Sequence, residues 1–149
     1  MTLKNKLAVL VAAAGKGPRS GLDYPKTLFE IDGQSILSRI LEVVPSLDLK
    51  PTIVASPAGE RPINKHLQSL SLSCDVVVQD HPLGMGNAVL KMLSAPAYHD
   101  ASDILLLWGD LPFIQRPTLE QTIKIHFKHN NDFTFPTLYS DSAYTLVKR

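Results

Sequence analysis

The chain has 149 residues, of which 44% are hydrophobic and 19% charged, and its net charge is +1. This length suits one domain, and this composition is typical of a globular protein and excludes a disordered one. The near-neutral charge gives no reason to expect nucleic acid or a membrane as a partner, and no apolar stretch is long enough to span a bilayer. We therefore expect a cytoplasmic protein whose electrostatic function is local.

Four apolar runs rich in valine, isoleucine and leucine lie at residues 6–14, 51–56, 74–79 and 103–110. They do not alternate with polar residues, which is typical of strands buried on both faces. Helical patterns separate and follow them at 35–44, 60–70, 86–95 and 117–130. This alternation predicts an α/β fold, a Rossmann-like, doubly wound and mostly parallel sheet with helices on both faces. We expect the strand order 3-2-1-4 in the N-terminal half.

The last part of the sequence predicts two more strands, at 132–139 and 143–149. The second of these includes the final residue, so we interpret residues 1–149 as a single domain that is the N-terminal part of a longer catalytic domain. The lone cysteine, Cys74, cannot form an internal disulfide, and its place before three valines favours a buried structural thiol. The sequence leaves the oligomeric state open, including a homo-oligomer.

A glycine-containing basic loop, AAAGKGPRSGLDYPK at residues 12–26, follows the first predicted strand. It fits two common phosphate motifs poorly. A Walker A loop requires Ser or Thr after the lysine, but Gly17 follows Lys16 here. A dinucleotide fingerprint requires a third glycine where Ser20 stands, and the expected acidic residue is not in place downstream.

A third interpretation is a loop that wraps a nucleoside triphosphate. Gly15 and Gly17 let backbone N–H groups approach phosphate oxygens without interference from a side chain. Three cations within a short stretch, opposed only by Asp23, make a local positive patch in a nearly neutral protein; they are Lys16, Arg19 and Lys26. The alternative is a solvated turn with chance cations.

The expected strand order brings a carboxylate to this loop. Ligands of doubly wound sheets bind beyond the carboxyl ends of the strands, where the strand order reverses. With the order 3-2-1-4 that point lies between the first and fourth strands, so residues 15–19 should lie beside Asp110. One carboxylate beside phosphate oxygens suits Mg²⁺, and we predict Asp110 as a magnesium ligand. By itself, Asp110 would be interpreted as the cap of a turn.

Three segments resemble the sugar-phosphate nucleotidyltransferase family. AAAGKGPRSGLDYPKTL is similar to the family's LAAGxGTR and PKxL signature, QDHPLGMGNAVLKM at 79–92 to its QxxxLGTGxA segment, and LLLWGDLPFI at 105–114 to its GDxPLI segment. These blocks resemble most the N-acetylglucosamine-1-phosphate uridyltransferase domain. The resemblance covers residues 7 to about 115 and is faint afterwards.

The resemblance implies transfer of a nucleoside monophosphate, UMP by preference, from a triphosphate to a sugar 1-phosphate, with release of pyrophosphate. It assigns Lys26 to the α-phosphate and Arg19, with Lys16, to the departing pyrophosphate. The base would lie along the small residues Ala12, Ala13 and Ala14. The resemblance matches Gln79 and Gly84 to the family's base-reading positions and puts Trp108 and Gly109 near the nucleotide, Trp108 more as a packing residue than a catalytic one. A second metal-binding Asp of the family would lie beyond this chain.

Three residues depart from the family pattern, at Pro18, Met85 and Thr145. Pro18 removes a hydroxyl and a backbone donor from the loop, and Thr145 stands where the uridyltransferase has a sugar-binding glycine. Three alternatives therefore stay open: a cytidylyltransferase for another phosphorylated acceptor, a regulatory module that binds nucleotide without catalysis, and a Rossmann dehydrogenase domain. His126 and His129 lie three residues apart on a predicted helix, and we interpret them as a solvated helix end rather than metal ligands.

Overall fold

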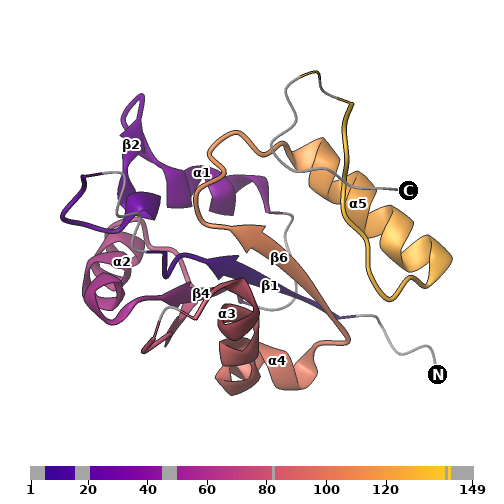
Figure 1. Cartoon of the computed structure of the whole chain (residues 1–149), viewed down its shortest axis with the longest axis horizontal. Helices are drawn as coiled ribbons and strands as arrows, with labels where there is room; N and C mark the ends of the chain where they lie inside the picture. Colours follow the sequence, from indigo (N-terminus) through magenta and orange to yellow (C-terminus); the bar gives the residue numbers. More distant parts are fainter. Residues whose placement is uncertain (1–5, 16–20, 45–49, 82, 140, 142–149) are drawn as a thin grey trace.

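Four parallel strands form the central sheet of the computed structural model, which describes residues 6–15, 21–44, 50–81, 83–139 and 141 (Figure 1). The strand order across the sheet is β5-β4-β1-β6. In chain order this is 3-2-1-4, which confirms the predicted topology. The strands are β1 (Leu7–Ala12), β4 (Thr52–Ala55), β5 (Asp75–Val78) and β6 (Asp103–Trp108).

Helices cover both faces of this sheet, as predicted (Figure 1). One face packs against α1 (Ile36–Val43), α2 (Pro57–Ser69) and α5 (Arg116–His129). The opposite face packs against α3 (Met85–Lys91) and α4 (Pro96–Asp100), which the short 3₁₀ helix η2 (Met92–Ser94) connects. Pro96 therefore ends one predicted helix but also begins another, because proline is tolerated in a first helical turn.

The hydrophobic core is centred on β1, whose side chains point alternately to the two faces. Val9 and Val11 belong to the core cluster under α1 and α2, and Ala8 and Leu10 to the cluster under α3. All four side chains have no exposed surface. A strand with an apolar residue at every position is therefore required here, which explains why the run at 6–14 does not alternate.

Serine caps fix the start of two helices in this core. Ser35 is the N-cap of α1, where its hydroxyl accepts a hydrogen bond from Ser38 N at 3.1 Å. His66 of α2 adds to this cap, since its Nε2 lies 2.7 Å from Ser35 Oγ and 3.0 Å from Ser38 Oγ. Ser56 caps α2 in the same way through Gly59 N. The cap of α1 therefore also connects α1 to α2.

A small hairpin precedes α1 and was not predicted. Its strands are β2 (Glu30–Ile31) and β3 (Gln34–Ser35), paired antiparallel through a turn at Asp32 and Gly33. Both turn residues have positive φ, 51° and 74°, as a type I′ turn requires. The Asp-Gly pair was the sequence signal for this hairpin.

The prediction of a strand at 132–139 is wrong. The structure has no strand there, and Leu138 and Tyr139 are 84% and 97% exposed. Aromatic and β-branched residues gave the strand-like pattern, but a strand also needs a hydrogen-bonded neighbour, and Pro136 lacks a backbone donor. The prediction for 143–149 lies outside the described residues.

Burial on both faces holds for β1 and β4 but is wrong for β6. Ile104, Leu106 and Trp108 are 37%, 37% and 50% exposed on one face of this strand. β6 is an edge strand. On this face of the sheet the core cluster is formed around β1 and β4. The sequence could not distinguish an edge strand from a central one, because both are runs of apolar residues here.

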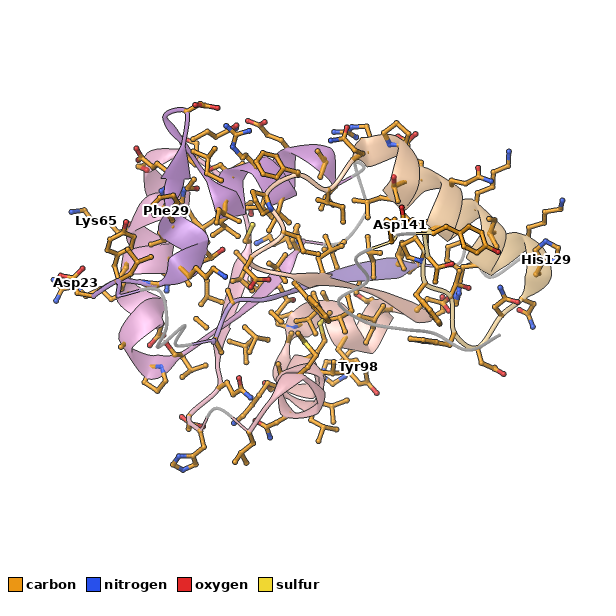
Figure 2. All side chains as sticks on the ribbon, turned by 45° about the horizontal axis from the view of Figure 1, so that its top comes forward. Asp23, Phe29, Lys65, Tyr98, His129 and Asp141 are labelled. Atoms are coloured by element: carbon orange, nitrogen blue, oxygen red, sulfur yellow. The ribbon has the colours of Figure 1, made fainter. Side chains whose placement is uncertain are left out.

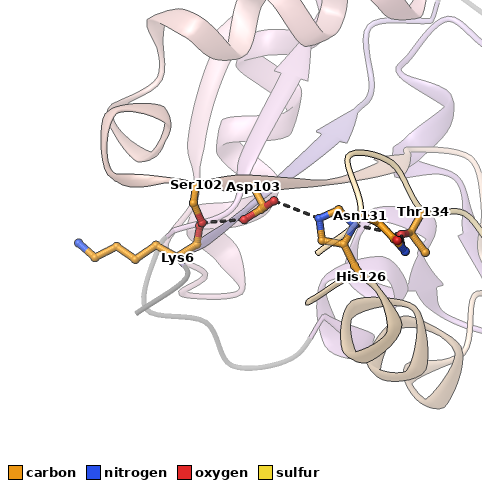
Figure 3. A network of polar contacts seen from close by, with 6 residues as sticks. All are labelled: Lys6, Ser102, Asp103, His126, Asn131 and Thr134. Carbon is orange, nitrogen blue, oxygen red and sulfur yellow. Dashed lines mark hydrogen bonds and ion pairs between the residues drawn. The ribbon is translucent and has the colours of Figure 1, made fainter. Parts of the chain in front are cut away.

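The prediction of a solvated helix end is wrong for His126. Figure 2 shows His129 at the far end of α5, away from the sheet. His126 Nε2 lies 3.0 Å from Asp103 Oδ1 and His126 Nδ1 lies 3.0 Å from Thr134 Oγ1 (Figure 3). The histidine therefore connects the segment after α5 to the start of β6. No helix in the described part of the chain is long and apolar enough to cross a membrane.

Candidate functional site

The candidate site lies at the carboxyl edge of the sheet, where β1 and β6 end side by side. The strands run in register up to the pair Ala12 and Trp108. Chain connections leave β1 toward β4 on one side, whereas β6 lies on the other side, so the strand order reverses between β1 and β6. This is the position at which doubly wound sheets bind ligands. The predicted residues Ala13, Ala14 and Gly15 follow β1 directly at this edge.

Close backbone packing shapes the floor of this site. Gly109 N donates to Ala12 O at 2.9 Å, and Ala13 N donates to Val54 O at 2.8 Å. A Cβ atom at Gly109 would lie 2.8 Å from Ala12 O and 3.1 Å from Ala13 Cα. Only glycine fits position 109 without moving the end of β1, so Gly109 has a structural reason to stand between Trp108 and Asp110.

Lys26 and Asp110 meet at this edge, as an ion pair across the site. Lys26 Nζ donates to Asp110 Oδ2 at 3.1 Å. Lys26 begins the 3₁₀ helix η1 (Lys26–Leu28), and Pro25 before it fixes the backbone on the entry side. The two side chains remain 44% and 47% exposed, so both charges stay accessible to a ligand. The sequence assigned one residue to phosphate and the other to metal, and the structure brings them together.

Gln79 lies at the end of β5 and is 3% exposed. Its Nε2 donates to Gly84 O at 3.2 Å and to Asn87 Oδ1 at 2.8 Å. Gly84 has φ of 88° and ψ of −177°, which only glycine adopts readily, and it is the residue before α3. The predicted base-binding residues Gln79 and Gly84 are thus joined to each other, and Asn87, which the sequence interpretation did not single out, accepts a hydrogen bond from Gln79.

Trp108 is the last residue of β6, where it pairs with Ala12 of β1, and it is half exposed. It is therefore available to a ligand as well as to packing. It is the only tryptophan of the chain. The predicted residues Lys16, Gly17 and Arg19, together with the departures Pro18 and Thr145, lie outside the described residues. The structure therefore describes the start of the loop, Ala12 to Gly15, and its far end at Lys26.

A magnesium ion fits this site only with help from a ligand. Among the residues that the structure describes, no group of three or more His, Cys, Asp and Glu side chains could share a metal ion. Asp110 is a single, half-exposed carboxylate at the carboxyl edge of the sheet. Mg²⁺ commonly binds one or two carboxylates and completes its shell with phosphate oxygens and water, so the donor set fits magnesium that arrives with a nucleotide.

The fold defines an α/β protein of the Rossmann-like type, with its candidate site where doubly wound sheets bind ligands. The chain belongs to the family of the MobA-like NTP transferase domain, whose profile it matches over residues 9–146. The bifunctional protein GlmU of Desulfitobacterium hafniense strain Y51 is 31% identical over 139 residues, which are 93% of this chain and 30% of that protein. GlmU of Mycobacterium tuberculosis strain H37Ra is 36% identical over 130 residues, 85% of this chain and 26% of that protein.

Solved structures share the fold at lower sequence identity. A CMP:2-keto-3-deoxy-manno-octonic acid synthetase complexed with CTP has a TM-score of 0.63 at 18% identity, over 85% of this chain and 49% of that one. A 4-diphosphocytidyl-2C-methyl-D-erythritol synthase of Anaerococcus prevotii has a TM-score of 0.62 at 19% identity, over 81% and 50% of the two chains. The present chain spans about 30% of the length of the first GlmU relative.

Proposed function

We propose that the protein transfers a nucleoside monophosphate from a nucleoside triphosphate to a sugar 1-phosphate, with UTP as the favoured donor and pyrophosphate as the leaving group. The observation that carries this proposal is the contact between Lys26 and Asp110 at the point where the strand order reverses. It would combine a cation for phosphate and a carboxylate for a metal ion beside small residues that would admit a flat base. Membership of the NTP transferase family and similarity to GlmU support the same reaction class.

The reaction needs no covalent intermediate with the enzyme. A sugar-phosphate oxygen attacks the α-phosphorus, the bond from this phosphorus to the bridging oxygen breaks, and pyrophosphate leaves with the electron pair. Catalysis of such a transfer rests on positioning and charge neutralisation. Lys26 would bind the α-phosphate, where negative charge is concentrated, and Arg19 with Lys16 would bind the leaving pyrophosphate.

Asp110 would hold Mg²⁺ against the phosphate oxygens. Bound there, the ion would neutralise charge on the triphosphate. Lys26 Nζ and Asp110 Oδ2 lie 3.1 Å apart without a ligand, so the ammonium group and the carboxylate are already close together before substrate binds. We place the reaction in the cytoplasm, with nucleotide and sugar phosphate as small-molecule partners and nucleotide-sugar biosynthesis as its context.

A cytidylyltransferase is the second candidate. Two solved structures with the same fold are named for CMP or diphosphocytidyl chemistry, one of them complexed with CTP. Their identities of 18% and 19% support the fold and leave the base open. The choice between UTP and CTP therefore depends on the residues around Gln79.

A binding panel tests the proposal. UTP, CTP, dTTP, ATP and NAD are titrated with and without Mg²⁺, using Trp108 fluorescence and isothermal calorimetry. We expect a pyrimidine triphosphate to bind best and to need Mg²⁺, and binding of NAD alone would contradict the proposal. Pyrophosphate release with a set of sugar 1-phosphates then tests turnover, and triphosphate binding without release from any of them favours a regulatory module.

A further inference from the structure

We propose that Asn87 sets the base selectivity of the site by fixing the side-chain amide of Gln79 with its oxygen toward the nucleotide. This inference rests on the proposed function and goes beyond it, because it names the residue that chooses between uracil and cytosine. Asn87 is a positioning residue here, since it acts through Gln79. Neither residue is charged, so the effect falls on the base and spares the phosphates.

The backbone around Gln79 leaves its side chain little freedom. Gln79 follows the last residue of β5, and its backbone N donates to Ala55 O at 2.8 Å. The side chain is 3% exposed. A buried amide must satisfy its hydrogen-bonding atoms inside the protein or with a ligand, because leaving them unpaired costs about 1–3 kcal/mol each.

Both hydrogens of the Gln79 amide nitrogen have acceptors. One is Asn87 Oδ1 at 2.8 Å and the other is Gly84 O at 3.2 Å. An amide nitrogen carries two hydrogens, so these bonds use both of its donors and leave Oε1 as the atom available to a base. The two bonds also oppose rotation of the amide by 180°, which would place its oxygen against two other oxygens.

Asn87 is well placed to hold this orientation because it belongs to a packed helix. It lies on α3, and the next residue, Ala88, is 3% exposed in the core cluster that contains Ala8 and Leu10 of β1. Gly84 O is held as well, since it accepts Ala88 N of the first helical turn at 3.2 Å. Both acceptors of the Gln79 amide therefore come from the start of α3, which packs on the core.

An amide oxygen fixed toward the ligand distinguishes the two pyrimidines. At ring position N3, uracil offers an N–H donor and cytosine offers only a lone pair. Gln79 Oε1 accepts from the uracil N–H and repels the cytosine lone pair, whereas a rotated amide would do the opposite. A site that pairs a polar atom of one substrate and leaves that of another unpaired discriminates strongly.

The test compares wild type with Asn87→Ala, Asn87→Asp and Asn131→Ala. Asn131 is a matched control, since its Nδ2 donates to Thr134 Oγ1 at 3.0 Å beside the start of β6, at the opposite edge of the sheet. Dissociation constants are measured by calorimetry for UTP and CTP with Mg²⁺, and for inorganic tripolyphosphate as a probe without a base. Thermal unfolding of each variant checks that it folds.

We expect wild type to prefer UTP, and Asn87→Ala to lower the ratio of the CTP and UTP dissociation constants by roughly three- to tenfold, the effect of one hydrogen bond. Tripolyphosphate binding should be unchanged. Asn87→Asp keeps an acceptor oxygen, so its ratio should stay within about twofold of wild type. Asn131→Ala should leave the ratio unchanged.

Four results would overturn the inference. An unchanged ratio in Asn87→Ala would show that Asn87 does not orient the amide, and an equal change in Asn131→Ala would show a general effect of stability. A wild-type preference for CTP would also overturn it while leaving the nucleotidyltransferase proposal intact. If UTP and CTP both bound no more tightly than tripolyphosphate, the proposed function itself would fail and the inference with it.

Discussion

Lys26 and Asp110 are 84 positions apart in the sequence, yet Lys26 Nζ lies 3.1 Å from Asp110 Oδ2. One residue begins a short 3₁₀ helix after the glycine-containing loop, and the other follows β6. The fold holds opposite charges together at an exposed edge, where an ion pair contributes little to stability. The pair is therefore better explained by a role in binding than by a role in folding.

Lys26→Met should weaken the binding of nucleoside triphosphates. The change removes a hydrogen-bonding cation and leaves the Asp110 carboxylate unopposed near the phosphates, so we expect roughly a tenfold loss of affinity or more. The measurement is a titration of UTP in the presence of Mg²⁺. Lys6→Met is the control, because Lys6 forms an ion pair of 3.9 Å with Asp100 beside the amino end of β1. Equal affinities of the two variants would argue against a phosphate-binding role for Lys26.

Gly109→Ala should destabilise the end of the sheet. The added Cβ would lie 2.8 Å from Ala12 O and 3.1 Å from Ala13 Cα, so the backbone of β1 must move. We expect a loss of about 1–3 kcal/mol in the free energy of unfolding by urea, and weaker nucleotide binding as well. Gly86→Ala is the matched control, since a Cβ there meets nothing within 4 Å and the residue lies in α3. A stability loss in both variants would contradict the close-contact explanation.

The contact between Asp103 and His126 should make part of the free energy of unfolding depend on pH. Burial raises the pKa of Asp103, but hydrogen bonds from Ser102 and His126 outweigh this, so the pKa of the carboxyl lies below its ordinary 3.8. A depressed pKa in the folded state stabilises the protein at pH values above 3.8, and this contribution is lost as the pH falls through the folded value.

Urea unfolding at pH 5 and pH 3 measures this contribution. Asp103→Asn should be less stable than wild type at pH 5, by about 1 kcal/mol or more, and the difference should shrink at pH 3. Asp100→Asn is a suitable control, because the Asp100 side chain is 63% exposed and faces Lys6 at 3.9 Å. A difference between wild type and Asp103→Asn that did not vary with pH would contradict the assignment.

Ser35→Ala should loosen the junction of α1 and α2. The Ser35 hydroxyl caps α1 and lies 2.7 Å from His66 Nε2 on α2. Loss of a serine cap costs about 1 kcal/mol of stability, and the contact with His66 adds to it. The measurement is urea unfolding, with Ser69→Ala as control, since Ser69 is exposed and its hydroxyl donates only to His66 O. A smaller loss for Ser35→Ala than for Ser69→Ala would contradict the role of the cap.

The sheet topology could be predicted from the sequence because the four apolar runs are separated by helical patterns, which leaves few arrangements. The strand order also placed residues 15–19 beside Asp110, but residues 16–19 lie outside the described part of the chain, so this stays a prediction. The observed contact of Asp110 with Lys26 was not predicted from the strand order. The information behind the topology is local in sequence, and general rules of connection supply the long-range step.

Other features needed tertiary contacts that no local pattern carries. The apolar pattern at 132–139 gave a strand prediction, but no strand in the described part of the chain pairs with it. His126 gains two hydrogen-bond partners only because α5 passes the start of β6. Asn87 was missed because its partner Gln79 lies eight residues away on another element. The signal available for it was the polar side chain at 87 among the apolar residues at the start of α3, beside a predicted base-binding segment.

Asp110→Asn tests the proposed binding of magnesium by Asp110 together with a nucleoside triphosphate. UTP is titrated with and without Mg²⁺, and Trp108 fluorescence reports binding beside the mutated residue. Wild type should bind UTP roughly tenfold more tightly with Mg²⁺, because the carboxylate and the ion attract each other. In the variant, which keeps the shape of the side chain, Mg²⁺ should change the affinity for UTP by no more than about twofold. A full magnesium effect in Asp110→Asn would contradict the account.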